Sequence, residues 1–310
     1  VMESSRDAAI VLSSSPPESA HVGAGILAQA ISARQIIDMR DGWLDEPLKP
    51  NLRSSSMRRW REGRVERALM CEADRVFVTS SVWRDLLLDR LRLQDGKVIV
   101  LTNAYPSIAL DEITGPTSTA ESESLVLLHA GRFTGSRLTQ TVESLLAPIL
   151  SGIPAGDPGG VIELLGQLEE RDIQDAGRLR GAFESRDWSI RVLESVSRPE
   201  MMQKLKASDG LLLLSASPAP IPSKLFEYLP TGKPILAVTQ RDSAVWRLGE
   251  RIEQIFLVDN ARPHAAPVVE EFFRACRSRA LFPDTPSCFS EASLSQKFLE
   301  SILPGYRASF

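Results

Sequence analysis

The sequence has little cysteine, few aromatic residues and no long hydrophobic run, and each shortage excludes a class of protein. Three cysteines (Cys71, Cys276 and Cys288) without a CxxC pair or nearby histidine exclude a disulfide framework and a zinc cluster. The longest apolar stretches, such as 22–31 and 211–214, fall far short of the roughly 20 residues that span a bilayer. Lys and Arg (36) are balanced by Asp and Glu (40), and the net charge of −4 argues against a protein that wraps nucleic acid.

The rest of the composition is that of an ordinary globular chain. Hydrophobic residues make up 43% of the 310 residues and charged residues 25%. At roughly 150 residues per domain, this length predicts two domains, each with a core of its own. No basic start followed by an apolar core is seen, so we expect a soluble, cytoplasmic protein.

Short apolar runs alternate with longer amphipathic stretches along most of the chain. Each run is four to six residues, rich in Val, Ile and Leu and without polar alternation, which is typical of parallel strands buried on both faces. The ten strand candidates are 8–13, 35–39, 75–79, 98–101, 124–128, 161–165, 189–193, 210–214, 234–238 and 255–258. Helical periodicity fills most of the gaps, for example at 57–72, 137–149 and 199–207. This alternation predicts an α/β fold of two Rossmann-like parallel sheets with right-handed crossovers.

A polar stretch around Thr114–Thr119 interrupts this rhythm, with four strands before it and six after it. We therefore predict a Rossmann-like N-terminal domain at 1–112, a linker at 113–124 and a second domain at 125–285. The segment 286–310, with a helix at 293–303, is expected to pack back across the domains. Four strands are fewer than the five or six of a complete doubly wound domain, and the first residue is not Met. We accordingly expect an abbreviated first domain whose natural N-terminal part is absent from this sequence.

The carboxyl ends of parallel strands are where open α/β sheets bind ligands, and two such sheets would face a cleft. After the strand at 124–128 comes a glycine-containing turn with His129, Gly131, Arg132 and Arg137. Backbone N–H groups beside glycine approach an anion closely, and arginine binds phosphate oxygens in forked geometry. An ordinary βα turn with a surface arginine is the alternative.

The segment after the strand at 210–214 is the most informative in the chain. Ser223 is a candidate helix N-cap, and Lys224 then falls in the first helical turn, where a cation is unfavourable unless an anion binds there. Glu227 follows at i+3 on the same side. A lysine for a diphosphate and a glutamate for a vicinal diol form a sensible pair. A plain Lys–Glu surface pair is the alternative.

At this point a resemblance to a known family becomes specific. Pro-Ser-Lys-Leu-Phe-Glu-Tyr-Leu at 222–229, followed by Gly-Lys-Pro-Ile-Leu at 232–236, resembles the donor-site signature of the retaining, GT-B-type glycosyltransferases of family 4. Supporting segments agree in order and spacing, and two of them (14–17 and 38–43) resemble the "sPP…d.RD.W" pattern of a bacterial surface-polysaccharide branch. The other supporting segments are 74–81, 97–104 and 197–211. The resemblance covers roughly residues 8–260.

The resemblance implies transfer of a sugar from a UDP- or GDP-linked donor to a glycan or lipid-linked acceptor, with retention and without a metal or cofactor. It implies that Glu227 binds the ribose and that Ser223, Lys224, Gly131 and the two arginines bind the diphosphate. The nucleobase would lie against the backbone near Val192 and Leu193. The family's first motif glutamate falls at Ala219, and this departure raises the alternative of a catalytically degenerate scaffold acting as a partner or regulatory subunit.

Two further features of the first domain are candidates for acceptor binding. Asp41 and Arg40, after the strand at 35–39, are expected to face the cleft and to contact the acceptor or handle its proton, with a salt-bridged strand end as the alternative. Six arginines between 53 and 67, together with Trp60, predict a solvated helix face. The alternative is contact with anionic lipid or a polyprenyl-diphosphate acceptor at the inner membrane face.

Two other interpretations are weighed less heavily. Gly23-Ala24-Gly25-Ile26-Leu27-Ala28 matches GxGxxA formally, but it lies inside a helical stretch and lacks the tight turn of a dinucleotide site. A nucleotide-sugar epimerase of the same architecture remains an alternative enzyme, although we identify no acid and base residues for it.

Overall fold

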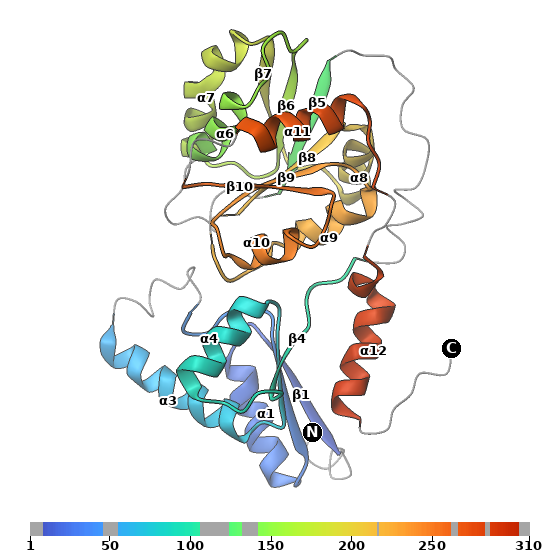
Figure 1. Ribbon diagram of the computed structural model, residues 1–310. Helices are drawn as coiled ribbons and strands as arrows, with labels where there is room; N and C mark the ends of the chain where they lie inside the picture. The colour runs from blue at the N-terminus through green and yellow to red at the C-terminus, as the bar shows by residue number, and fades with distance from the viewer. Residues whose placement is uncertain are drawn as a thin grey trace. The chain divides into compact units, whose positions relative to one another are not determined.

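The computed structural model describes residues 9–45, 55–105, 124–131, 142–215, 217–261, 266–282 and 286–303. The fold is α/β with two parallel sheets of four and six strands (Figure 1). Contacts divide the chain into two compact units, one of Val1–Asn103 with Leu294–Phe310 and one of Ala104–Ser293. Within the described residues, no helix is long and apolar enough to cross a membrane. The predicted fold class of two Rossmann-like parallel-sheet domains is confirmed.

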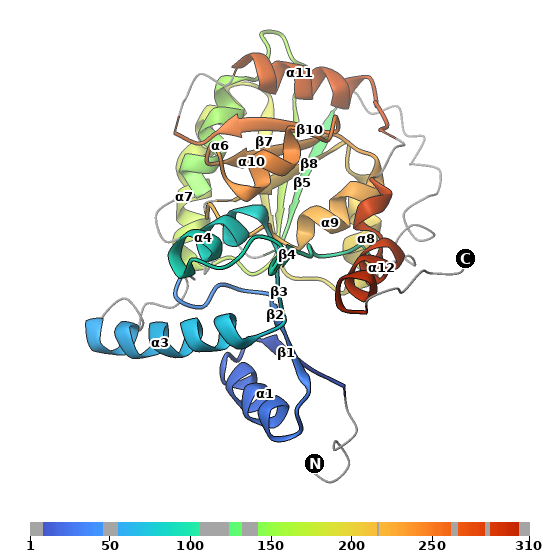
Figure 2. The ribbon, with the colours of Figure 1, turned by 60° about the horizontal axis from the view of Figure 1, so that its bottom comes forward.

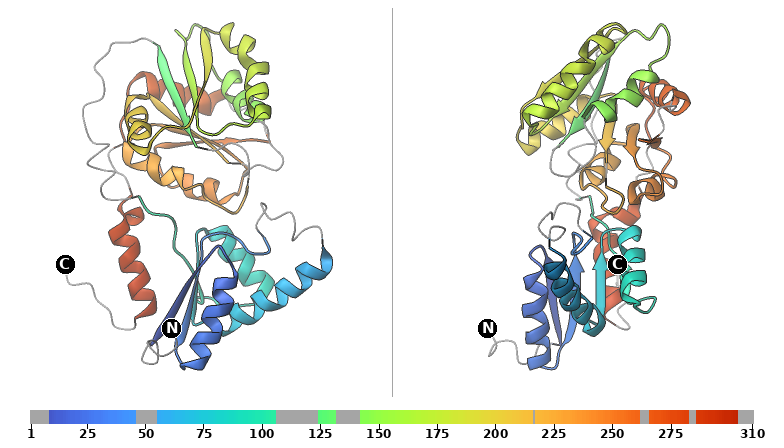
Figure 3. Two further views of the ribbon diagram at one scale, coloured as in Figure 1. Left: turned by 180° about the vertical axis from the view of Figure 1, so that it is seen from behind. Right: turned by 90° about the vertical axis from the view of Figure 1, so that its left-hand side faces the viewer.

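The sheet of the first unit has the strand order β1-β2-β3-β4, and all its pairs are parallel. Its strands are β1 (Ile10–Ser15), β2 (Arg34–Met39), β3 (Arg75–Val78) and β4 (Val98–Val100). Because each crossover is right-handed and steps in the same direction, the connecting helices share one face of the sheet. These are α1 (Ser19–Ala30), α3 (Ser56–Glu72) and α4 (Ser81–Leu91), and α12 (Glu291–Ile302) covers the other face (Figure 3, left).

Local sequence explains where the helices of this unit begin. The Ser55 hydroxyl accepts the N–H of Arg58 at the start of α3, and the Ser80 hydroxyl accepts the N–H of Trp83 at the start of α4. On the α12 face, the rings of Phe77 and Phe298 lie 5.0 Å apart. That contact ties the end of the chain to the first sheet.

A buried ion pair joins α3 to α4. Glu66 is fully buried, and its two carboxylate oxygens accept hydrogen bonds from the Arg90 guanidinium at 2.5 and 2.9 Å. Arg90 also donates to Asp45 at 3.0 Å. Burial raises the pKa of Glu66 above its usual range, although the bonds from Arg90 oppose that rise.

The sheet of the second unit has the order β10-β9-β8-β5-β6-β7, again with all pairs parallel. Its strands are β5 (Leu125–Ala130), β6 (Gly160–Leu165), β7 (Trp188–Leu193), β8 (Gly210–Leu214), β9 (Ile235–Thr239) and β10 (Ile255–Asp259). One face carries α6 (Val142–Ser151), α7 (Glu170–Glu184) and α11 (Ala266–Arg277). The other face carries α8 (Arg198–Ala207), α9 (Lys224–Tyr228) and α10 (Ala244–Gly249) (Figure 2).

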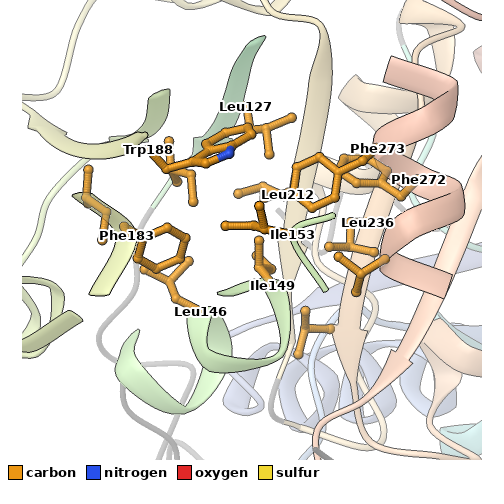
Figure 4. Close-up of a cluster of buried hydrophobic side chains, with 14 of the residues drawn as sticks. Leu127, Leu146, Ile149, Ile153, Phe183, Trp188, Leu212, Leu236, Phe272 and Phe273 are labelled. Atoms are coloured by element: carbon orange, nitrogen blue, oxygen red, sulfur yellow. The ribbon is translucent and has the colours of Figure 1, made fainter. Parts of the chain in front are cut away.

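The core of the second unit lies between the sheet and the face of α6, α7 and α11. Trp188 of β7 packs edge-on against Phe273 of α11, with ring centroids 5.3 Å apart (Figure 4). Leu127 and Leu212, on the two central strands, are fully buried in the same cluster. Burial of this apolar surface from both halves of the sheet holds the central strands β5 and β8 together.

The buried lysine Lys233 predicts that the stability of this unit depends on pH. Its ammonium is buried and donates to the carbonyls of Lys206 and Ser208. Burial lowers its pKa from 10.5 to about 8. Between these two values the unfolded chain binds a proton that the folded chain lacks, so the stability of the folded state rises with pH.

We therefore expect the stability of the wild type relative to Lys233→Met to increase by about 1–2 kcal/mol between pH 7.5 and 9.5. Urea unfolding at both pH values measures the change. Lys297→Met, at an exposed position of α12, is the control and should change the stability little at either pH value. A difference that stays constant or shrinks with pH contradicts the prediction.

All ten predicted strands are present, with boundaries that move by at most two residues. Two extensions matter. Ser14 and Ser15 belong to β1 because they pair with Asp38 and Met39, and His129 belongs to β5 because it pairs with Leu164 of β6 rather than lying in a turn. The predicted helices at 57–72, 199–207 and 293–303 are also present. Of the predicted helix at 137–149, residues 137–141 lie outside the described residues, as does all of the predicted linker except Ser124.

Candidate functional site

The strand order of the second sheet reverses between β5 and β8. From β5 the chain proceeds to β6 and β7, and it then returns to β8 and continues to β9 and β10 on the other side. At such a switch point the connections leave toward opposite faces, and a crevice opens at the carboxyl ends of the two strands. The residues after β5 and β8 are those that the sequence selects as candidates.

His129, near the end of β5, links the two central strands to the segment after them. It is completely buried. Its Nδ1 lies 2.9 Å from the carbonyl oxygen of Leu212 on β8, and its Nε2 lies 3.1 Å from Nζ of Lys224. The imidazole thus connects two strands and the helix that follows one of them.

Gly131 begins the turn after β5, and its geometry accepts only glycine without strain. Its φ is +115°, and a Cβ added there would lie 2.9 Å from Lys224 Nζ. Its N–H donates to the carbonyl of Leu165, and the carbonyl of Gly131 lies against Gly166, where an added Cβ would come within 2.5 Å of it. Two glycines therefore let the ends of β5 and β6 and the Lys224 ammonium approach one another.

Helix α9 brings Lys224 and Tyr228 to the end of β5. The Tyr228 hydroxyl accepts the backbone N–H of Ala130 at 2.8 Å, which fixes α9 to the end of β5. Burial raises the pKa of the Tyr228 phenol. Lys224, four residues earlier, reaches His129 and the space over Gly131. Gly131 and Lys224, which are both predicted to bind the diphosphate, therefore lie close together in the structure.

The prediction that the Ser223 side chain caps this helix is wrong. Ser223 precedes α9, but its own φ and ψ of −56° and −32° are helical, and its hydroxyl makes no capping bond. A side-chain cap needs extended backbone at the N-cap, which directs the hydroxyl back over the first turn. Ser223 is exposed at the edge of the candidate site, and its predicted contact with a diphosphate stays a prediction.

Glu227, the predicted ribose ligand, is partly exposed and lies 3.8 Å from Arg198 at the start of α8. Arg198 is more than half exposed, so the pair is weak and open to competition. The end of β7 is near α8 in sequence: Val192 is exposed and Leu193 is partly buried. Their predicted contact with a nucleobase stays a prediction, and Arg132 and Arg137 lie outside the described residues.

The first unit has its own polar cluster at the carboxyl edge of its sheet. Arg40, after β2, lies 3.4 Å from Asp38, and it donates hydrogen bonds to the side-chain oxygen of Asn103 and, at 3.2 Å, to the carbonyl of Leu101. Asp38 also accepts from the Ser14 hydroxyl at 3.0 Å. The salt-bridged strand end that we weighed as the alternative is therefore what Arg40 forms, whereas Asp41 beside it is exposed.

Buried polar atoms at this edge lack a hydrogen-bond partner among the described residues. They include Ser15 Oγ and His21 Nε2. The other ring nitrogen of His21 lies 2.8 Å from the Ser13 hydroxyl, and burial lowers the pKa of this imidazole. Since buried polar groups are generally paired, these atoms point to a place where a polar ligand or water completes the structure.

Several residues of the second unit's site are not evident from the sequence alone. Gly166 is not among the predicted site residues, Tyr228 is named only as part of the segment 222–229, and His129 is named only as part of the turn after the strand at 124–128. Ser217, after β8, has a buried hydroxyl without a partner among the described residues. One signal could have identified these residues: each lies at or directly after the end of a buried strand, or within the segment 222–229. Among the residues that the structure describes, no three His, Cys, Asp or Glu side chains gather as a metal site.

Of the comparisons with known proteins, the search of solved structures finds similar proteins. Neither a scan against protein-family models nor a search of curated proteins finds a match. Solved structures with the two-domain fold of the GT-B glycosyltransferases match nearly the whole chain, and this fold is therefore the fold of the protein.

Three of these structures illustrate the range. HepE of Anabaena in complex with UDP is similar with a TM-score of 0.69 at 15% identity, over 97% of this chain and 80% of that one. A UDP-forming trehalose-phosphate synthase from Burkholderia xenovorans gives 0.64 at 16% identity, over 96% and 74%. A putative UDP-N-acetylglucosamine 2-epimerase from Listeria monocytogenes gives 0.53 at 12% identity, over 97% and 77%. Transferases and an epimerase share this fold, so the activity has to be inferred from the residues of the site.

Proposed function

We propose that this protein is a glycosyltransferase that moves a sugar from a nucleotide-sugar donor, UDP- or GDP-linked, to a glycan or lipid-linked acceptor. The observation that carries the proposal is the convergence of Lys224, Gly131 and His129 at the switch point of the second sheet. A cation over a glycine turn is a binding place for phosphate oxygens. Solved structures of this fold include complexes with UDP and with UDP-glucose, which supports a donor of this class.

The roles in the second unit follow from side-chain chemistry. Lys224 is a donor-only group suited to the diphosphate, and Glu227 is an acceptor-only group suited to the two hydroxyls of a ribose. The proposed contact for the base is the backbone near Val192, which is exposed, and Leu193, which is partly buried. Arg132 and Arg137 are proposed as further cations for the diphosphate.

The acceptor is proposed to bind at the carboxyl edge of the first sheet. Asp41 is exposed there, and Arg40 is anchored by Asp38 and by carbonyl groups. We propose that Asp41 contacts the acceptor hydroxyl and that Arg40 shapes the edge. A bacterial surface polysaccharide is the proposed product class, with the protein cytoplasmic and in contact with the inner membrane face through the arginine-rich helix α3.

In the proposed reaction the bond between the anomeric carbon and the diphosphate oxygen breaks, and a bond to the acceptor oxygen forms on the same face of the sugar. The leaving phosphate takes the proton of the acceptor. Negative charge grows on the diphosphate as the bond breaks, so fixed cations such as Lys224 lower the barrier. Because these cations are side chains, the proposal needs no metal or other cofactor.

The test is nucleotide binding measured by calorimetry with UDP and GDP. Lys224→Ala removes a charge-assisted contact worth about 1.5–3 kcal/mol, so we expect binding to weaken by roughly 10- to 150-fold. Glu227→Ala should weaken binding of nucleotide by about tenfold through loss of the ribose hydroxyl bonds.

Arg180→Ala is the matched control, because it removes an exposed cation from the second half of α7, which leads away from the carboxyl edge of the sheet. It should bind nucleotide as the wild type does. Binding that is unchanged in both Lys224→Ala and Glu227→Ala removes the basis for the proposed function.

A specific observation favours a second candidate, a scaffold that binds donor without turnover. Ala219 stands where the resembling family has its first motif glutamate, and it is buried. Transfer or hydrolysis of a nucleotide-sugar in the presence of an acceptor extract excludes this candidate. Tight binding without any turnover would establish it instead.

A further inference from the structure

His129 has a place in the site but no role in the function proposed above. It is fully buried at the end of β5, and it contacts a carbonyl on one side and an ammonium on the other. A buried imidazole between two fixed polar partners is a constrained group, and its partners determine its protonation.

The two contacts fix the tautomer. The Leu212 carbonyl can only accept a hydrogen bond, so Nδ1 carries the proton and donates. The Lys224 ammonium can only donate, so Nε2 presents its lone pair. The ring is therefore neutral, and its plane is held by β8.

This arrangement limits where the Lys224 ammonium can go. One of its N–H groups is directed at His129, and the ammonium lies over Gly131, where an added Cβ would come within 2.9 Å of Nζ. A free lysine side chain has many rotamers, and an anion that binds it must restrict them. Holding the ammonium in place beforehand removes that part of the cost of binding.

The geometry points to His129 as a positioning residue that holds Lys224 ready for the diphosphate of the donor. The inference rests on the proposed function and deepens it, because it assigns the imidazole to one group of the ligand. His129 would strengthen binding of nucleoside diphosphates and leave binding of the nucleoside alone unchanged. Its effect would pass entirely through Lys224.

A double-mutant cycle tests this. Wild type, His129→Leu, His129→Gln, Lys224→Ala and the double variant His129→Leu/Lys224→Ala are titrated by calorimetry with UDP and GDP, and with uridine and guanosine. His129→Leu should weaken binding of the diphosphate by about three- to tenfold, as expected for loss of one hydrogen bond. His129→Gln, which keeps an acceptor for Lys224, should recover most of that loss.

The double variant should bind no more weakly than Lys224→Ala alone, since His129 has nothing left to position. If His129→Leu weakens binding equally in both backgrounds, or weakens the nucleosides as much as the diphosphates, the imidazole acts through the fold and the inference is wrong. Unchanged binding in His129→Leu overturns it as well. If His129→Leu does not fold, His129→Ala replaces it in the same comparison, and His129→Gln remains the variant that keeps an acceptor.

The same titrations distinguish failure of the proposed function from failure of the inference about His129. If the wild type binds neither UDP nor GDP, both the proposed function and the inference are wrong. If binding depends on Lys224 but does not change in the His129 variants, only the inference is wrong.

Discussion

Gly131→Ala is expected to lose nucleoside diphosphate binding by about tenfold or more while the protein stays folded. The new methyl group would lie 2.9 Å from Lys224 Nζ and 3.1 Å from its Cε. Because the lysine is flexible, it yields, and its ammonium moves away from the place over the turn. The loss is then that of one charge-assisted hydrogen bond, about 1.5–3 kcal/mol. Calorimetry with UDP and GDP measures it.

Gly156→Ala is the matched control for backbone strain. Gly156 has a φ of +76°, and an added Cβ meets nothing within 4 Å. In both variants an alanine has to adopt a backbone conformation with positive φ, which lowers the stability by an amount on the order of 1–3 kcal/mol. Only Gly131→Ala should affect binding. Equal losses of binding in the two variants, or none in either, would show that the turn after β5 does not hold the ligand through Lys224.

Arg90→Met is expected to have the largest effect on stability, about 3–5 kcal/mol in the free energy of unfolding. It leaves the Glu66 carboxylate fully buried without the two hydrogen bonds that it accepts from the guanidinium. Urea unfolding at pH 7 measures the loss. The double variant Glu66→Leu/Arg90→Met removes both charges and should regain most of the stability.

The pH dependence of Arg90→Met follows from Glu66. Burial already raises the pKa of Glu66, and loss of Arg90 removes the bonds that oppose this rise. The folded variant then binds a proton that the unfolded chain releases, so its stability falls as the pH rises. The deficit relative to wild type should therefore shrink between pH 7 and pH 5. Arg84→Met, which breaks a pair that is exposed on both sides, should change stability by less than about 0.5 kcal/mol.

The ten strands were predictable because each is a continuous apolar run bounded by turn residues, a pattern that local sequence carries. The segment at 222–229 was also predictable, because its residue types can be recognised without knowledge of the tertiary structure. Predictions based on a single residue's usual role were less secure. Ser223 is a common N-cap residue, yet its backbone is helical and its hydroxyl caps nothing. For Arg40 the sequence left an acceptor contact and a salt-bridged strand end open, and the structure shows it held by Asp38 and by carbonyl groups.

By itself the sequence determined the two parallel-sheet units and the segment that carries Lys224 and Glu227. Only the tertiary structure decided that Lys224 meets His129, which lies 95 residues earlier. That meeting depends on β5 and β8 being neighbours, although two strands separate them along the chain. Strand order depends on how the helices bury both faces of the whole sheet. A local sequence pattern does not specify this arrangement. The burial of Glu66 against Arg90 has the same origin, since it arises only when α3 and α4 pack side by side.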